Sequence, residues 1–247
     1  QEGVQEVSNG SFSQEGAELV LNPNFNDSTW WGLDASWSIL NGAANSNGSG
    51  TMYKGGVLTV GKNYKVVVSV SSYTSGTLSY PNASNYTIPS EVGVYTFYYT
   101  ANSQTVSFTG NSFIGSIDNV SVKEVGQDWT LGSGWSIGEG KALNTGGANF
   151  SDLTQINTDI IIGKNYKITY TVSDYVSGSF KFIMNSNTTA GLERNADGTY
   201  TDYLTSAAQA YSFRTQGSGF IGSITNISVK EVGQDWALTG GWSIGDS

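Results

Sequence analysis

Apolar and polar residues alternate along most of this chain with a period of two, the pattern of β-strands that bury one face. The clearest run occurs twice, with inward positions Tyr64, Val66, Val68 and Val70 and later Tyr166, Ile168, Tyr170 and Val172. Glycine- and serine-rich turns separate the runs at intervals of about 8 to 12 residues, as in β-sandwiches. The pattern predicts an all-β protein built of tandem antiparallel β-sandwich (jelly-roll) modules, with about eight strands in each.

Two strings recur and divide the sequence into tandem copies. Gly61–Lys65 returns as Gly163–Lys167, and Phe113–Val125 returns with few changes as Phe220–Val232. Each copy is followed by the same Gly-Gln-Asp-Trp string. We therefore predict an N-terminal lead-in (1–17), a first sandwich (18–125), a second sandwich (126–232), and a tail (233–247) that starts a third repeat or is exchanged with a neighbour.

One position breaks the hydrophobic pattern of the repeat. Asp202 stands where the first copy has Phe97, on a face that should be buried. A carboxylate in a core needs a partner, and so we expect a bulge or a local register change there rather than a buried charge. The second copy is also a few residues longer, and we place the extra residues in a loop at 185–196.

Charge and composition exclude several functions. The net charge is −9 and the chain has no histidine and no cysteine, which argues against a nucleic-acid partner, thiolate or imidazole metal sites, and imidazole bases. The acidic residues that both copies share, Glu124 and Glu231, each follow a lysine, and the acidic group of the second copy (Asp174, Glu193, Asp197 and Asp202) has no counterpart in the first. No apolar run is long enough to span a membrane. We predict that the protein is not an enzyme, binds no nucleic acid and has no membrane span.

The order of these motifs also carries a resemblance. The strings Glu18–Phe25, Trp37–Ile39, Gly-Lys-Asn-Tyr-Lys and Ser116–Val122 resemble the jelly-roll, carbohydrate-binding-module-like repeats of phage virion structural proteins, of the marine phage type. Val7–Gly16 is similar to the lead-in that such repeats have. The resemblance implies a non-catalytic phage appendage or capsid-decorating fibre on the virion exterior. Its partners would be copies of itself, other virion proteins and surface glycans.

Two other functions remain open at this point. The chain is alternatively a cell-surface adhesin or extracellular filament subunit of a bacterium or archaeon, secreted or held at the cell surface. It is alternatively the glycan-binding portion of a secreted polysaccharide-degrading enzyme, because similar modules occur attached to secreted glycosidases.

The same resemblance implies a structural calcium ion as the one candidate cofactor. Many members of the family hold the ion between an acidic residue near the first strand and an aspartate just before the last strand. The matching positions in the first copy are Asp118 with Asp27 and Asn26, whereas the second copy has Thr225 in place of the aspartate. Calcium needs about six oxygen ligands, and so the first copy is the better candidate.

Aromatic side chains are the candidates for glycan or partner contact. They lie in turns or on the expected outer face: Trp30, Trp31, Tyr73, Tyr86, Tyr98, Tyr175 and Tyr203. Other tryptophans recur at matched positions and are expected to fill cores or module contacts: Trp37, Trp129, Trp135, Trp236 and Trp242. Trp30-Trp31 has no evident counterpart in the second copy, which favours it as a ligand site.

Overall fold

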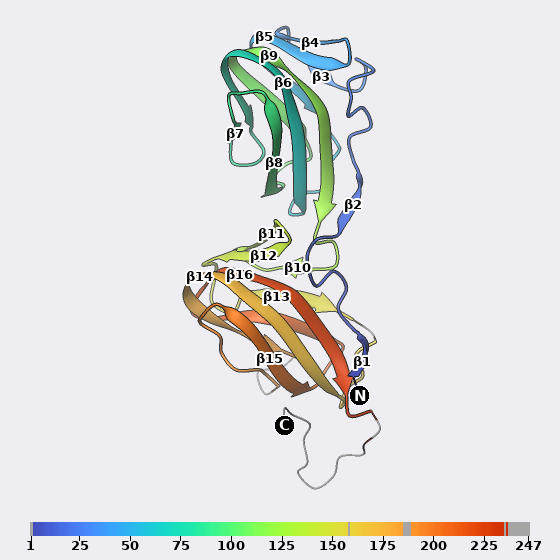
Figure 1. The fold of residues 1–247 in the computed structure, drawn as a ribbon, viewed down its shortest axis with the longest axis vertical. Coiled ribbons are helices and arrows are strands. Elements are labelled where there is room, and N and C mark those ends of the chain that lie inside the picture. The colour runs from blue at the N-terminus through green and yellow to red at the C-terminus, as the bar shows by residue number, and fades with distance from the viewer. Residues whose placement is uncertain (1, 158, 185–188, 235, 237–247) are drawn as a thin grey trace. The chain divides into compact units, whose positions relative to one another are not determined.

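The computed structural model describes residues 2–157, 159–184, 189–234 and 236, and every helix or strand assigned in them is a β-strand. The chain forms two compact units (Figure 1). Module 1 is Glu15–Val125, and module 2 combines Gln1–Gln14 with Gly126–Ser247. The predicted class, tandem antiparallel β-sandwiches, is confirmed. None of the described residues belongs to a helix that is long and apolar enough to cross a membrane.

Module 1 is one hydrogen-bonded sheet that bends into a sandwich. Its strands are β2 (Glu15–Glu18), β3 (Gly32–Leu33), β4 (Trp37–Leu40), β5 (Ala43–Lys54), β6 (Asn63–Tyr80), β7 (Tyr86–Ile88), β8 (Gly93–Thr100) and β9 (Val106–Val125). The strand order is β3-β5-β9-β6-β7, with β2 on β9, β4 on β5 and β8 on β6. Three long strands, β5, β6 and β9, therefore connect the rest.

The long strands of module 1 contribute to both layers because they bend. The first part of β6 (63–70) pairs with β8 and the end of β9, and its last part pairs with β7 and the start of β9. The register between β6 and β9 shifts repeatedly between Val67 and Thr77. Gly76 lies in this bend at φ +81°, and a Cβ atom there would collide with the carbonyl group of Ser112. The bend therefore requires glycine.

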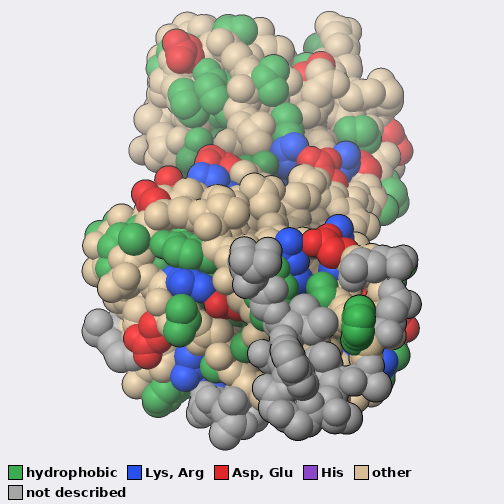
Figure 2. Space-filling model, turned by 60° about the horizontal axis from the view of Figure 1, so that its bottom comes forward, with side chains coloured by type: hydrophobic (Ala, Val, Ile, Leu, Met, Phe, Trp, Pro, Cys, Tyr) green, Lys and Arg blue, Asp and Glu red, His purple; other side chains and the backbone are tan. Residues whose placement is uncertain are grey.

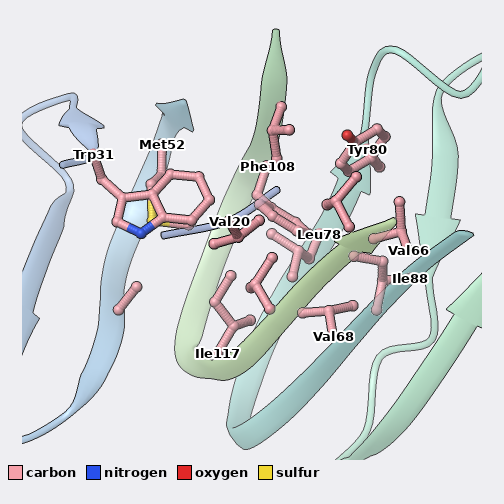
Figure 3. Packing of buried hydrophobic residues seen from close by; sticks show 14 of the residues in the cluster. Val20, Trp31, Met52, Val66, Val68, Leu78, Tyr80, Ile88, Phe108 and Ile117 are labelled. Carbon is pink, nitrogen blue, oxygen red and sulfur yellow. The ribbon is translucent and has the colours of Figure 1, made fainter. Parts of the chain in front are cut away.

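The inward residues of module 1 form one apolar core between the layers. Figure 3 shows Val66 and Val68 of β6 facing the same space as Phe108 and Ile117 of β9, and all four are fully buried. Each such side chain contributes about 1.5–3 kcal/mol when it is removed from water. The period-two alternation in the sequence is thus explained by burial of one face of each strand.

Module 2 repeats this arrangement. Its strands are β1 (Glu2–Gln5), β10 (Thr130–Leu131), β11 (Trp135–Gly138), β12 (Lys141–Thr145), β13 (Asp152–Ile156), β14 (Asn165–Ile183), β15 (Gly198–Thr205) and β16 (Ala210–Val232). β14 pairs with β15 and β16 as β6 pairs with β8 and β9, and β12 and β13 both pair with β16 as β5 pairs with β9. Each module thus has eight strands among its described residues.

The structure divides the N-terminus differently from the predicted lead-in (1–17). β1 pairs with β16 of module 2, whereas β2 pairs with β9 of module 1. The reason is a short repeat: Gln-Glu-Gly begins both segments, and Phe12 corresponds to Phe25. Residues 1–14 are therefore the first strand segment of module 2. Of the predicted tail (233–247), only residues 233, 234 and 236 are described, so that prediction falls largely outside the described residues.

Candidate functional site

A strip of polar side chains crosses the outer face of module 1 over four neighbouring strands. Tyr98 on β8 lies opposite Lys65 on β6, and Lys65 lies opposite Lys123 on β9. Glu15 on β2 accepts hydrogen bonds from Lys65 Nζ at 2.6 Å and from Lys123 Nζ at 3.0 Å. These bonds hold the pKa of the Glu15 carboxyl below its usual value, and the bond to Glu15 raises the pKa of Lys65. The strip fixes the first strand to the sheet and ends in a half-buried phenol ring.

Module 2 carries the same strip. Tyr203 on β15 lies opposite Lys167 on β14, which lies opposite Lys230 on β16. Glu2 on β1 accepts hydrogen bonds from Lys167 Nζ at 2.9 Å and from Lys230 Nζ at 3.2 Å, and these bonds lower the pKa of Glu2. Tyr98 and Tyr203 are thus two predicted contact residues that the structure places beside hydrogen-bond donors on an outer face. Figure 2 shows such neighbouring acidic and basic groups, with hydrophobic side chains only in small clusters.

Three of the other predicted tyrosines have structural contacts. Tyr73 and Tyr175 occupy equivalent places beside the bends of the two modules, and their hydroxyls donate to the carbonyl oxygens of Gly76 and Gly178, each at 3.1 Å. Their rings lie 6.3 Å from buried phenylalanine rings. Tyr86 stacks on a core phenylalanine at 4.3 Å. These residues brace the modules, and their rings are only partly available to a ligand.

Trp31 belongs to the core, contrary to the prediction that it contacts a ligand. It is 4% exposed, belongs to the same buried cluster as Met52 (Figure 3), and donates from Nε1 to the carbonyl oxygen of Asn22 at 3.3 Å. Its counterpart in module 2 is Trp129, because the residues after each tryptophan form the equivalent edge strands β3 and β10. The expectation that the second copy lacks this tryptophan was therefore wrong; the turn before it differs between the copies.

Trp30 is the member of the pair that stays near the surface. It is half-buried, contacts Trp31 edge-on at 4.6 Å, and has Lys54 Nζ 5.4 Å from its ring centroid. The neighbouring Tyr53 is 46% exposed and lies against Gly32, where a side chain would collide with its ring. Tyr53 was not predicted, although its outward position in an alternating strand was a usable signal. Module 2 has Asp128 in place of Trp30, and so this aromatic group is specific to module 1.

The predicted calcium ligands make local hydrogen bonds. The Asp118 carboxylate accepts from the Asn119 amide N at 2.7 Å, and Asp27 accepts from the Thr29 amide N at 2.7 Å and from its hydroxyl at 2.8 Å. Asn26 donates its amide N–H to the side chain of Asn22. No group of three or more acidic side chains in the described part of the chain is placed to hold a metal ion. The calcium site stays a prediction.

Asp202 is buried and charged, and the predicted bulge at this position is wrong. It is 6% exposed and pairs in regular register with Ile168, with no shift along β14 and β15. Its carboxylate accepts from Arg194 Nη2 at 2.6 Å and from the Tyr170 hydroxyl at 2.9 Å, and Arg194 Nε donates to that hydroxyl at 3.2 Å. Burial beside Asp202 raises the pKa of Tyr170. The partner that the carboxylate needed comes from the loop at 185–196.

Module 1 has apolar residues at the same places. The isolated bridge between Phe180 and Arg194 corresponds to the pairing of Leu78 with Ile88, so Arg194 stands where module 1 has Ile88. Asp202 likewise stands where module 1 has Phe97. Ile88 and Phe97 are both buried. An apolar pair in one module is thus replaced by an ion pair in the other, which indicates a structural role.

Two hollows lined by described residues are small. One, of about 170 Å³, lies beside the bidentate ion pair of Asp152 and Arg214 in module 2. Another, of about 140 Å³, is lined by residues 35–38 and 45–47 of module 1. Ligand pockets are typically roughly 300–1,000 Å³. Neither hollow can enclose a ligand of ordinary size, and so contacts made there would be to a surface.

Comparisons with known proteins add little to this description. No protein-family model matches the sequence, and no curated protein matches it. Among solved structures, one similar chain is the N-terminal CBM22-1-CBM22-2 tandem domain of Xyn10C from Paenibacillus barcinonensis. The likeness has a TM-score of 0.30 and 7% identity, covering 89% of this chain and 98% of that one. A likeness of this size assigns neither a function nor a ligand.

Proposed function

We propose that this chain is a non-catalytic structural protein of a phage particle, an appendage or capsid-decorating fibre that displays its sandwich modules outward and contacts glycans. The observation that carries the proposal is the duplication itself: the same sandwich occurs twice, with the same outer strip of tyrosine, lysines and glutamate. Modules that repeat the same outer surface suit a protein that displays this surface or acts as a spacer. An enzyme instead needs one cleft in which reactive groups converge. Placement on a virion is supported by the resemblance of the repeat motifs to virion proteins.

Ion pairs favour structural roles for four acidic residues of the described part of the chain. Glu15 and Glu2 are each held by two lysines, Asp152 by Arg214, and Asp202 by Arg194. A hydrolase that uses two carboxylates keeps them about 5–10 Å apart across a substrate cleft, one of them with a raised pKa. Carboxylates neutralised by basic partners do not meet this requirement. We therefore propose binding without catalysis.

Glycan contact would use aromatic rings that are not consumed by the core. Tyr98 on the strip of module 1 and Trp30 beside Tyr53 are the best placed, since each ring lies near a lysine that can donate to sugar hydroxyls. An aromatic face stacks on the apolar face of a sugar, while neighbouring donors fix its orientation.

A glycan array with the whole chain tests the binding part of the proposal. We expect wild-type protein to bind a restricted set of glycans, and Trp30→Ala or Tyr98→Ala to weaken binding by about tenfold, which corresponds to roughly 1.4 kcal/mol. The control is Val94→Ala, an exposed apolar residue on the same strand as Tyr98. Binding that none of these substitutions alters, or no binding to any glycan, contradicts glycan contact through these rings.

Particle composition tests the placement. Mass spectrometry of purified phage particles, and immunogold labelling of the intact particle, should find the chain on the outside. Its recovery from a cell surface or a secreted filament without a capsid would reassign it to the adhesin or filament class. A catalytic domain in the same reading frame would reassign it to a polysaccharide-degrading enzyme.

A further inference from the structure

The first-strand segment of module 2 matches that of module 1 contact for contact. In module 1, Phe25 is 1% exposed and lies 5.6 Å from the ring of Trp31; in module 2, Phe12 is 2% exposed and lies 5.2 Å from Trp129. Trp129 Nε1 donates to the carbonyl oxygen of Asn9 at 3.3 Å, as Trp31 donates to that of Asn22. The core of module 2 is therefore closed by the segment of residues 1–14.

The backbone and side-chain bonds of the two segments agree as well. The amide of Glu6 donates to the carbonyl oxygen of Val229 at 2.8 Å, and the amide of Ile227 donates to that of Gly10 at 2.9 Å. Gln5 Oε1 accepts from the Val229 amide at 2.8 Å, as Glu18 Oε1 accepts from Val122 in module 1. With the Glu2 ion pairs, module 2 thus has a strand-accepting edge with apolar, polar and charged subsites for this one segment.

The two modules differ in how the segment is connected. In module 1 the chain runs directly from β2 through Phe25 to Trp31. In module 2 the first-strand segment, residues 1–14, is separated in sequence from the rest of its module, which starts at Gly126, by all of module 1. Only Ser13 and Gln14 separate Phe12 from the start of β2. A short connection of this kind favours exchange of the segment between chains, because the segment of another copy can form identical contacts.

A tryptophan of the same type follows β16 of module 2 in the sequence. Trp236 follows the second Gly-Gln-Asp string, and its amide donates to the Gly233 carbonyl oxygen at 3.0 Å, as the amide of Trp129, after the first such string, donates to Gly126. Trp236 is nevertheless 75% exposed, whereas Trp129 is 5% exposed. The two tryptophans that a first-strand segment covers, Trp31 and Trp129, are 4% and 5% exposed.

We propose that the edge of module 2 is an interface between copies of this chain, at which residues 1–14 of a second copy supply the first strand. Reciprocal exchange gives a closed dimer, and one-way donation gives an open filament. The donated strand is recognised by its glutamate between two lysines and by its phenylalanine against Trp129. This goes beyond the proposed display function, since it would hold equally for an adhesin or a filament.

The absence of cysteine from the sequence allows a direct crosslinking test. Glu2 and Val232 are paired across β1 and β16, and Glu15 and Val125 are paired in the same way across β2 and β9. Such cross-strand pairs have Cα separations of about 4.5–5.5 Å, within disulfide range. Two differently tagged chains, one Glu2→Cys and the other Val232→Cys, are co-expressed and oxidised, with Glu15→Cys and Val125→Cys chains as the matched control.

Exchange predicts a covalent dimer of the two tagged chains for the module 2 pair and none for the module 1 pair, where the strand is continuous with its module. A single chain that carries both module 2 cysteines and crosslinks only within itself overturns the proposal, as does equal dimer formation by both pairs. Light scattering of the unmodified full chain gives an independent result. A dimer or longer assembly supports exchange, and a monomer at all concentrations overturns it.

Discussion

The buried ion pair of module 2 should be replaceable as a unit and not one partner at a time. Removing one partner of a buried pair typically costs about 3–5 kcal/mol, because the other charge is left without compensation. Asp202 is 5% exposed and Arg194 is 14% exposed in their side chains, so water can replace little of the lost interaction. We expect Arg194→Ile alone, or Asp202→Phe alone, to destabilise module 2 by about this amount.

Module 1 supplies the sequence that should restore stability. The double variant Arg194→Ile with Asp202→Phe copies Ile88 and Phe97, and it removes both charges together. It leaves the buried Tyr170 hydroxyl without its two partners, at a cost of about 1–3 kcal/mol. Adding Tyr170→Val, the residue at this place in module 1, removes that cost. The triple variant should then be within about 1–2 kcal/mol of wild type, allowing for altered packing.

Differential scanning calorimetry can follow the two modules separately. For units of this size, about 1 kcal/mol changes the melting temperature by roughly 2–8 °C, so either single variant should lower the module 2 transition by at least about 6 °C. The module 1 transition is the internal control and should stay in place. Single variants that cost less than about 1 kcal/mol, or a double variant whose loss equals the sum of the singles, would refute the reasoning.

Two further predictions concern the strips and the bends. The pKa values of Glu2 and Glu15 are lowered in the folded protein, so their contribution to stability is complete above the usual carboxyl value of 4.5 and is lost as the pH falls through the folded value. Melting temperatures between pH 2 and 6 should therefore fall with acid, and less steeply in the double variant Glu2→Gln with Glu15→Gln; an unchanged slope contradicts this. Gly178→Ala should destabilise module 2 by about 2–4 kcal/mol in urea unfolding, because φ is +76° at this residue and the added Cβ atom would collide with the Gly219 carbonyl group. A loss of stability below about 1 kcal/mol would argue against the bend geometry.

Much of the fold was predictable because it depends on local alternation. Tyr64 and Tyr166 are the second residues of the equivalent strands β6 and β14 and are both buried, as the period-two pattern requires. The assignment of the first strands to the two modules was not predicted. Their short repeat has a spacing of about a dozen residues, and only the longer repeat of whole modules was recognised. Once Gln-Glu-Gly is matched in both segments, Phe12 aligns with Phe25 without any structural knowledge.

The candidate site was less predictable because it depends on contacts between distant residues. The sequence marked Asp202 as a residue that needs a partner, but that partner, Arg194, lies in the loop at 185–196, where module 1 has the apolar Ile88. Trp31 and Trp30 are neighbours of the same type, and only the packing shows that one lies in the core and the other beside Lys54. The lysine and glutamate strips join four strands, so no local pattern predicts them.

Residues 1–14 complete the sheet and core of module 2, and the other conclusions depend most on this claim. Hydrogen exchange measured by mass spectrometry tests it, because protection is measured separately for each segment of the chain. Phe12→Ala, which should cost about 3–5 kcal/mol as a buried truncation, is predicted to speed exchange in β16 and around Trp129 while β6 and β9 keep their protection. Phe25→Ala should do the reverse. Loss of protection in module 1 after Phe12→Ala, or no change in either module, would contradict the account.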